Sequence, residues 1–150
     1  MKDRYGEEAA VVLSFLPTQG PSITVRESGP SLPLVERIRD GLLFAEFEAL
    51  IGLLQIPEEE LGRLLGISPA TLHRRKRSGK LGSPESERVV RFARLFGLAS
   101  EVLESEEAAR SWLKATNPGT AGEAPLAYAD TEFGAREVEH LLGRLDHGVF

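Results

Sequence analysis

The residues with the clearest chemical potential lie in the segment ISPATLHRRKRSGK, residues 67–80. Five Lys or Arg side chains and one His fall within eight consecutive residues of it, and no acid interrupts them. Guanidinium and ammonium groups bind phosphate oxygens, and arginine also pairs with guanine through two parallel hydrogen bonds. The segment therefore indicates a nucleic-acid-binding element, although a basic run alone is more typical of a solvated helix face.

The residues around this segment predict the helix-turn-helix that would present it to DNA. A first helix is expected in EEELGRLLG, residues 58–66, opened by Pro57 and three acids and ended by Gly66. A second helix is expected to begin after an N-cap at Ser68 and to stop at Gly79. Small Gly62 lets the two helices approach each other. The apolar residues expected to hold them together are Leu61, Leu64, Leu65, Ile67 and Leu72.

The outer side of the second helix carries the candidate DNA contacts. Its hydroxyl groups can bind phosphates or bases, and its arginines can pair with guanine. The predicted DNA-binding residues are Ser68, Thr71, His73, Arg74, Arg75 and Arg77. Arg75 stands where such motifs usually place a buried apolar residue, which suggests that the helix end is short or lies against the backbone. Arg88, Arg91 and Arg94 are interpreted as further phosphate contacts or as plain surface residues, and the second interpretation is favoured for Arg91.

The composition is that of a globular protein with one ordinary domain or two small ones: 150 residues, 41% hydrophobic and 27% charged. Zero Cys excludes disulfides, thiolate chemistry and a Cys-based zinc site, and it fits a reducing cytoplasm. No apolar run approaches the roughly 18 residues that span a bilayer. The stretch MKDRYGEEAAVVLSFLP does not have the pattern of a signal peptide. We therefore expect a cytoplasmic protein with no membrane partner.

Charge is distributed unevenly along a chain whose net charge is −5. Residues 68–99 hold eight basic and two acidic side chains. Residues 1–67 hold six basic and eleven acidic ones, and residues 100–150 hold four basic and ten acidic ones. The basic middle could face phosphates while an acidic flank faces a different partner.

Helical periodicity predicts an all-α fold from about Leu34 onward. Helices are expected in LVERIRD, which ends at Gly41, in LLFAEFEALIGLL, and in SPESERVVRFARLFGLASEVL with Ser83 as its N-cap. SEEAARSWLKA predicts a short helix in which Trp112 packs, and TNPGTAGEAP predicts a loop. The segment LAYADTEFGAREVEHLLGRLDHGVF is expected to contain a final helix, with Val138, Leu141, Leu142 and Leu145 on one face. The expected division is a partly ordered arm at 1–30, a helix-turn-helix domain at 31–104 and a small helical domain at 105–150.

Most of the chain resembles one known family. LLGISPATLHRRKRSGKLGSPESERVVRFARLF, and then EEAARSWLKATNPGTAGEAPLAYADTEFGAREVEHLLGRLDHGVF, are similar to antitoxins of the Xre/MbcA/ParS type. The resemblance runs from about Gly41 to Phe150. Its most specific parts are the helix TLHRRK, the Ala109–Leu113 pattern A-x-x-W-L, Asn117, the Pro125–Leu126 pair and the ending DTEFGAREVEHLLGRLDHGVF.

The resemblance implies a type II toxin–antitoxin module. The helix-turn-helix would bind the module's operator, as a homodimer within a larger complex, and residues 105–150 would neutralise a RES-domain toxin that destroys NAD. In the last helix, Asp130 and Thr131 can cap the N-terminus, Gly134 allows another backbone to come close, and the tail Arg144–Phe150 would block the toxin's active site. The residues assigned to toxin binding are Asp130, Thr131, Gly134, Arg144, Asp146, His147, Gly148, Val149 and Phe150.

No pattern in the chain indicates catalysis, a cofactor or a metal. His140 and His147 are seven residues apart, but only Glu137 and Glu139 lie nearby and no zinc-type spacing results. The glycines form neither a phosphate-binding loop nor a dinucleotide fingerprint, and the serines lack a nucleophile elbow. Two alternatives to a non-enzymatic antitoxin stay open. One is a free-standing transcriptional regulator whose C-terminal region only dimerises, and the other is an interaction scaffold without DNA contact.

Overall fold

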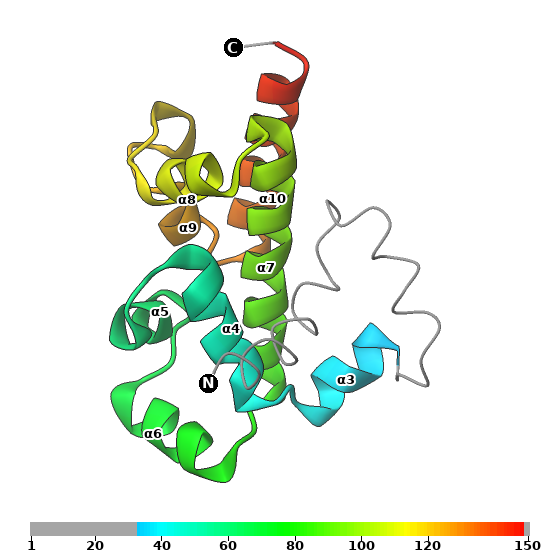
Figure 1. Ribbon diagram of the computed structural model, residues 1–150, viewed down its shortest axis with the longest axis vertical. Coiled ribbons are helices and arrows are strands. Elements are labelled where there is room, and N and C mark those ends of the chain that lie inside the picture. Colours follow the sequence, from blue (N-terminus) through cyan, green and yellow to red (C-terminus); the bar gives the residue numbers. More distant parts are fainter. Residues whose placement is uncertain (1–32, 149–150) are drawn as a thin grey trace.

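The computed structural model describes residues 33–148, so the expected arm at 1–30 lies outside the described residues, as do Val149 and Phe150. Within 33–148 there are eight α-helices, one short 3-10 helix and no strand, which confirms the all-α prediction. Helix α7, Ser83–Leu103, follows the long axis of the molecule, and the other helices pack around it (Figure 1). None of the helices in this part of the chain is long and apolar enough to cross a membrane.

One half of the molecule surrounds the N-terminal part of α7 (Figure 1). Its helices are α3 (Leu34–Asp40), α4 (Phe44–Leu54), α5 (Glu58–Leu64) and α6 (Pro69–Ser78). Phe47 and Leu50 of α4 are fully buried in one core with Phe92 and Phe96 of α7. This core supports the two helices of the predicted helix-turn-helix, α5 and α6.

The other half packs on the C-terminal part of α7 (Figure 1). Its elements are α8 (Glu106–Lys114), the 3-10 helix η2 (Pro118–Thr120), α9 (Pro125–Tyr128) and α10 (Glu132–Asp146). Leu113, Leu126, Val138 and Leu142 are buried in the shared core, and Trp112 packs against it with partial exposure, as predicted. Both halves therefore use α7 as a common support.

The caps of α6 agree with the sequence prediction, whereas the cap of α7 does not. The Ser68 hydroxyl accepts the backbone N–H of Thr71 at 3.2 Å, and Gly79 ends α6 with φ of +82°. Ser83, predicted as the N-cap of α7, is instead its first residue, and the N-cap is Gly82. The Glu85 carboxylate accepts the Gly82 N–H at 2.6 Å, so an acid in the first turn satisfies the N–H of the N-cap residue itself.

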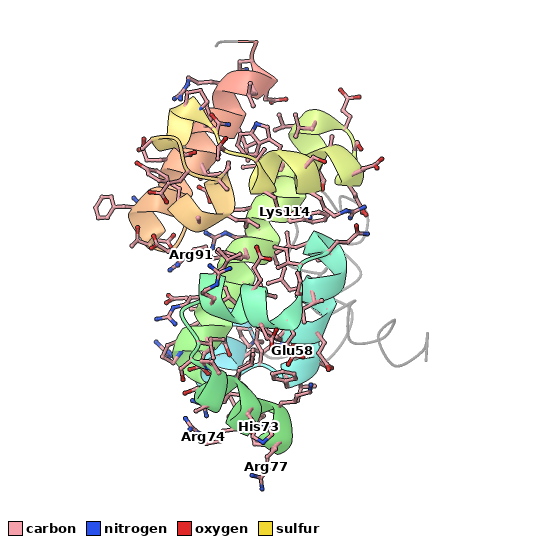
Figure 2. The ribbon with its side chains drawn as sticks, turned by 90° about the vertical axis from the view of Figure 1, so that its left-hand side faces the viewer. Glu58, His73, Arg74, Arg77, Arg91 and Lys114 are labelled. Carbon is pink, nitrogen blue, oxygen red and sulfur yellow. The ribbon has the colours of Figure 1, made fainter. Side chains whose placement is uncertain are left out.

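Cations of α8 bind the end of α4 and join the two halves. Arg110 donates to the Leu53 carbonyl at 3.1 Å, and Lys114 donates to the Leu54 carbonyl at 3.0 Å. The last carbonyls of a helix have no partner within it, and the helix dipole favours positive charge there. Lys114 lies between the two halves (Figure 2). These bonds fix the position of α8 on the half that carries the helix-turn-helix.

Candidate functional site

Helices α5 and α6 form the predicted helix-turn-helix. Gly66 makes the turn with φ of +73°, a conformation that favours glycine. A Cβ at Gly62 would lie 3.1 Å from the Leu72 side chain, so the small residue does allow the close approach. Ile67 closes the turn by donating its N–H to the Gly62 carbonyl at 2.8 Å. Both the turn at Gly66 and the packing role of Gly62 are confirmed.

The outer face of α6 lies at one end of the molecule. His73, Arg74 and Arg77 are exposed there and point away from the protein body (Figure 2). The side chains of His73 and Arg77 make no hydrogen bond or ion pair with another residue of 33–148. Arg74 donates to the Thr71 hydroxyl at 3.4 Å, and Thr71 also accepts the Ser68 hydroxyl at 3.1 Å. Hydroxyl and guanidinium donors therefore gather on the first turns of α6, where a recognition helix meets DNA.

Arg75 differs from the other arginines of α6 because it folds back onto the protein. Its Nε lies 2.9 Å from the Glu85 carboxylate, which also caps α7. The side chain therefore links the end of α6 to the start of α7, and it fills the place that the motif usually gives to an apolar residue. The remaining ion pairs of the segment are Lys76–Glu58 at 3.3 Å and Lys80–Asp40 at 2.9 Å.

The arginines of α7 bind within the protein rather than forming a continuous phosphate-facing row. Arg88 donates to the Leu65 carbonyl at 2.9 Å and so holds the end of α5. Arg94 lies 3.6 Å from the Glu132 carboxylate and 3.5 Å from that of Glu139. Both side chains remain partly exposed.

Arg91 is buried, so its assignment to the surface was wrong. It is 7% exposed, and its Nη1 lies 3.3 Å from the Asp130 carbonyl and 3.5 Å from the Ala129 carbonyl. Its Nε donates to the Glu132 carboxylate at 3.1 Å. A buried guanidinium needs such acceptors for its charge and its donors. Arg91 therefore fixes the turn between α9 and α10 (Figure 2).

The start of α10 brings together three residues predicted to bind a toxin, but two of them act within the fold. Thr131 is the N-cap, as predicted, and its hydroxyl accepts the Gly134 N–H at 3.0 Å. The backbone that comes close to Gly134 is the chain's own, because a Cβ there would collide with the Tyr128 carbonyl. Of these three residues, only Asp130 has an exposed side chain with no capping or packing role at the start of α10. Gly134 is buried in the described structure, and its close contact there is an internal one.

The C-terminal end of α10, where the predicted tail begins, lies at the opposite end of the molecule from α6 (Figure 1). Arg144, Asp146, His147 and Gly148 are exposed, and Gly148 follows the helix with φ of +71°. Leu145, between them, packs against the core. In the described part of the tail, the side chains of Arg144, Asp146 and His147 are therefore exposed on either side of Leu145, which packs against the core.

Phe133 is a surface residue that the sequence analysis missed. It is 84% exposed at the second position of α10. It lines a hollow of about 300 Å³ together with Tyr128, Glu123, Asp130 and Glu137. Helical periodicity was the available signal, because it places Phe133 on a different face of α10 from the buried residues. Those buried residues are Gly134, Ala135, Val138 and Leu142.

The histidines do not assemble a metal site. His140 lies 3.8 Å from the Glu137 carboxylate on the same exposed helix face. Within residues 33–148, no group of three His, Asp or Glu side chains is placed to hold a metal ion.

Comparisons with known proteins agree with this arrangement. Residues 33–94 match the family described as the antitoxin Xre-like helix-turn-helix domain, and residues 98–148 match the antitoxin Xre/MbcA/ParS C-terminal toxin-binding domain. An "Antitoxin Xre" from Yersinia enterocolitica is 34% identical over 119 residues, which cover 78% of this chain and 80% of that protein.

Two further relatives are more distant. An "Antitoxin Xre" from Photorhabdus laumondii is 27% identical over 140 residues, covering 91% of this chain and 86% of that protein. A "Prs ADP-ribosylating antitoxin" from Sphingobium sp. is 24% identical over 123 residues, covering 75% and 77%.

Proposed function

Because this chain belongs to the Xre/MbcA/ParS antitoxins, we propose that it neutralises a RES-domain toxin that consumes NAD and represses the operon encoding both proteins. The chain is an antitoxin with a helix-turn-helix domain and a C-terminal toxin-binding domain. It acts in the cytoplasm, as a homodimer within a larger toxin–antitoxin complex. It contributes binding rather than catalysis.

The observation that carries this proposal is the separation of two surfaces along α7. The exposed donors of α6 lie at one end of the molecule, and the end of α10 lies at the other (Figures 1 and 2). An α-helix of 21 residues such as α7 is about 30 Å long. One antitoxin can therefore hold DNA and toxin at the same time without steric conflict between them.

Operator binding depends on the exposed face of α6. Arg74 and Arg77 are placed to meet phosphates or guanine bases, and Ser68 and Thr71 supply hydroxyl groups beside them. A homodimer would present two such helices to successive major grooves, as a palindromic operator requires. Arg75, which is paired with Glu85, contributes by placing α6 against α7.

Neutralisation depends on the tail from Arg144 to Phe150. Leu145 packs against the core near the start of this segment. We assign to the residues after it a contact at the entry of the toxin's NAD site, where they exclude the substrate. The exposed carboxylate of Asp130 and the acidic start of α10 add a second contact on the toxin.

The name of the Sphingobium relative refers to ADP-ribosylation. ADP-ribosyl transfer also consumes NAD, so an NAD measurement detects a toxin of either chemistry. Incorporation of labelled ADP-ribose into protein then separates the two, because only transfer leaves the label on a macromolecule.

The test is expression of the reading frame adjacent to this chain's own, with and without the chain, followed by measurement of cellular NAD. The proposal expects NAD to fall with the neighbouring product alone and to be preserved when the chain is present. The purified complex should also shift DNA from upstream of the operon. DNA binding without protection of NAD would instead support the free-standing regulator.

A further inference from the structure

Phe133 is the most exposed of the large apolar side chains in residues 33–148. It is 84% exposed, against 58% for Val35 and 48% for Leu43. Val138 and Leu142 of the same helix face the core, whereas the Phe133 ring faces solvent. Aromatic side chains of this kind are enriched at the centres of protein interfaces, where they bury a large area with few rotatable bonds.

Contacts within the fold hold the backbone that carries the Phe133 ring. Thr131 caps the helix through the Gly134 N–H, and Gly134 packs against the Tyr128 carbonyl. Arg91 donates hydrogen bonds to the carbonyls of Ala129 and Asp130 in the preceding turn. An anchor fixed in this way loses little conformational entropy when a partner covers it.

The hollow beside the ring is acidic. Glu123, Asp130 and Glu137 line it together with Tyr128 and Phe133, and no Lys or Arg is among the lining residues. Arg136, which is exposed on the same helix, does not line it. Two aromatic rings and three carboxylates form an environment suited to a guanidinium group, which stacks on rings and donates paired hydrogen bonds to carboxylates.

We propose that Phe133 and this hollow form an anchor that receives an arginine side chain from the toxin surface. The inference rests on the proposed toxin partner and names the chemistry of the contact. The guanidinium lies against the aromatic rings while Glu123 and Glu137 accept its N–H groups. This contact supplies affinity, whereas the tail after Leu145 blocks the NAD site.

The charge of the surrounding surface also fits a basic partner. Residues 100–150 hold ten acidic and four basic side chains. Two of those four, Arg110 and Lys114, are bound to carbonyls at the end of α4. The toxin-binding half therefore presents a negative field, which accelerates association with a positive surface and weakens in salt.

The first test measures binding of the purified product of the adjacent reading frame to full-length variants. Phe133→Ala should weaken binding by about thirtyfold, the size expected of an interface hot spot, while Phe133→Tyr, which keeps the ring, should retain affinity. Val35→Ala is the matched control, because it removes exposed apolar surface from the other half. Failure of the unaltered chain to bind would refute the proposed function, whereas equal binding by Phe133→Ala would refute only this anchor.

The second test examines charge and the partner residue. The double variant Glu123→Gln, Glu137→Gln should slow association and reduce its dependence on salt, whereas Glu107→Gln, which removes one exposed acid on α8 outside the hollow, should change both much less. A photoreactive benzoyl group placed on the Phe133 ring should crosslink to a toxin peptide that contains arginine. Crosslinking to a second copy of this chain, or to a toxin peptide without arginine, would overturn the inference.

Discussion

The Arg91 guanidinium on α7 lies 3.3 Å from the carbonyl oxygen of Asp130, the residue before the N-cap of α10. Through this bond, the helix that supports the helix-turn-helix also fixes the start of the toxin-binding helix. A long apolar core and a small number of buried cation–carbonyl bonds thus hold the two functional surfaces at a constant separation.

Replacement of Arg91 by Ala should lower the free energy of unfolding by about 2–4 kcal/mol, since it leaves buried carbonyls without a donor. Arg94→Ala is the matched control on the same helix. Arg94 only pairs with exposed or half-exposed carboxylates, so its loss should cost less than about 1 kcal/mol. Urea denaturation of the two variants measures the difference, and equal destabilisation would contradict the buried role of Arg91.

Gly134→Ala should destabilise the protein by about 1–3 kcal/mol, because the added Cβ collides with the rigid Tyr128 carbonyl. Gly143 lies on the same helix, and a Cβ there would meet nothing within 4 Å. Gly143→Ala should therefore leave stability unchanged or raise it by up to about 1 kcal/mol. Thermal unfolding distinguishes the two, and a harmless Gly134→Ala would show that the α9–α10 turn can shift.

Replacement of Arg74 and Arg77 by Ala should weaken operator binding and flatten its salt dependence. Loss of two phosphate contacts changes the slope of log K against log salt by about 2 for each protomer. Arg136→Ala, which removes an exposed arginine of α10, should leave the slope unaltered. A titration at several salt concentrations gives the slopes, and an unaltered slope for the double variant would argue against phosphate contact.

Arg75→Ala should lower the stability of the protein more than its affinity for the operator. Its partly buried pair with Glu85 predicts a loss of about 1 kcal/mol, whereas the exposed pair of Lys76 with Glu58 predicts about 0.5 kcal/mol or less. The salt slope of operator binding should stay close to that of the unaltered protein. A slope reduced as much as by Arg77→Ala would mean that Arg75 leaves Glu85 and contacts phosphate.

Features set by local chemistry were predictable from the sequence. Ser68, Gly66 and Gly79 act within a turn or two of themselves, so the ends of α5 and α6 were correctly placed. The Ser83 cap was wrong because the helix begins one residue earlier than expected, with Gly82 as its N-cap and the Glu85 carboxylate on the Gly82 N–H. A serine followed by proline does not by itself decide whether that serine is the N-cap or the first residue of the helix.

Features that depend on distant contacts were not predictable. The acceptors of Arg91 lie 38 and 39 residues away, and a charged residue type pointed to the surface. Its position four residues before buried Leu95 was the available signal for burial. Gly134 was correctly read as a site of close backbone approach, but the sequence does not say whose backbone approaches.

The most direct test of the account compares cellular NAD in cells that express the toxin with the full chain or with a chain ending at residue 143. A second truncation, which ends at Asp146, keeps Leu145 in the core and controls for loss of folding. Both truncated chains should still bind the operator but should no longer preserve NAD. Full preservation of NAD by the chain ending at Asp146 would contradict it.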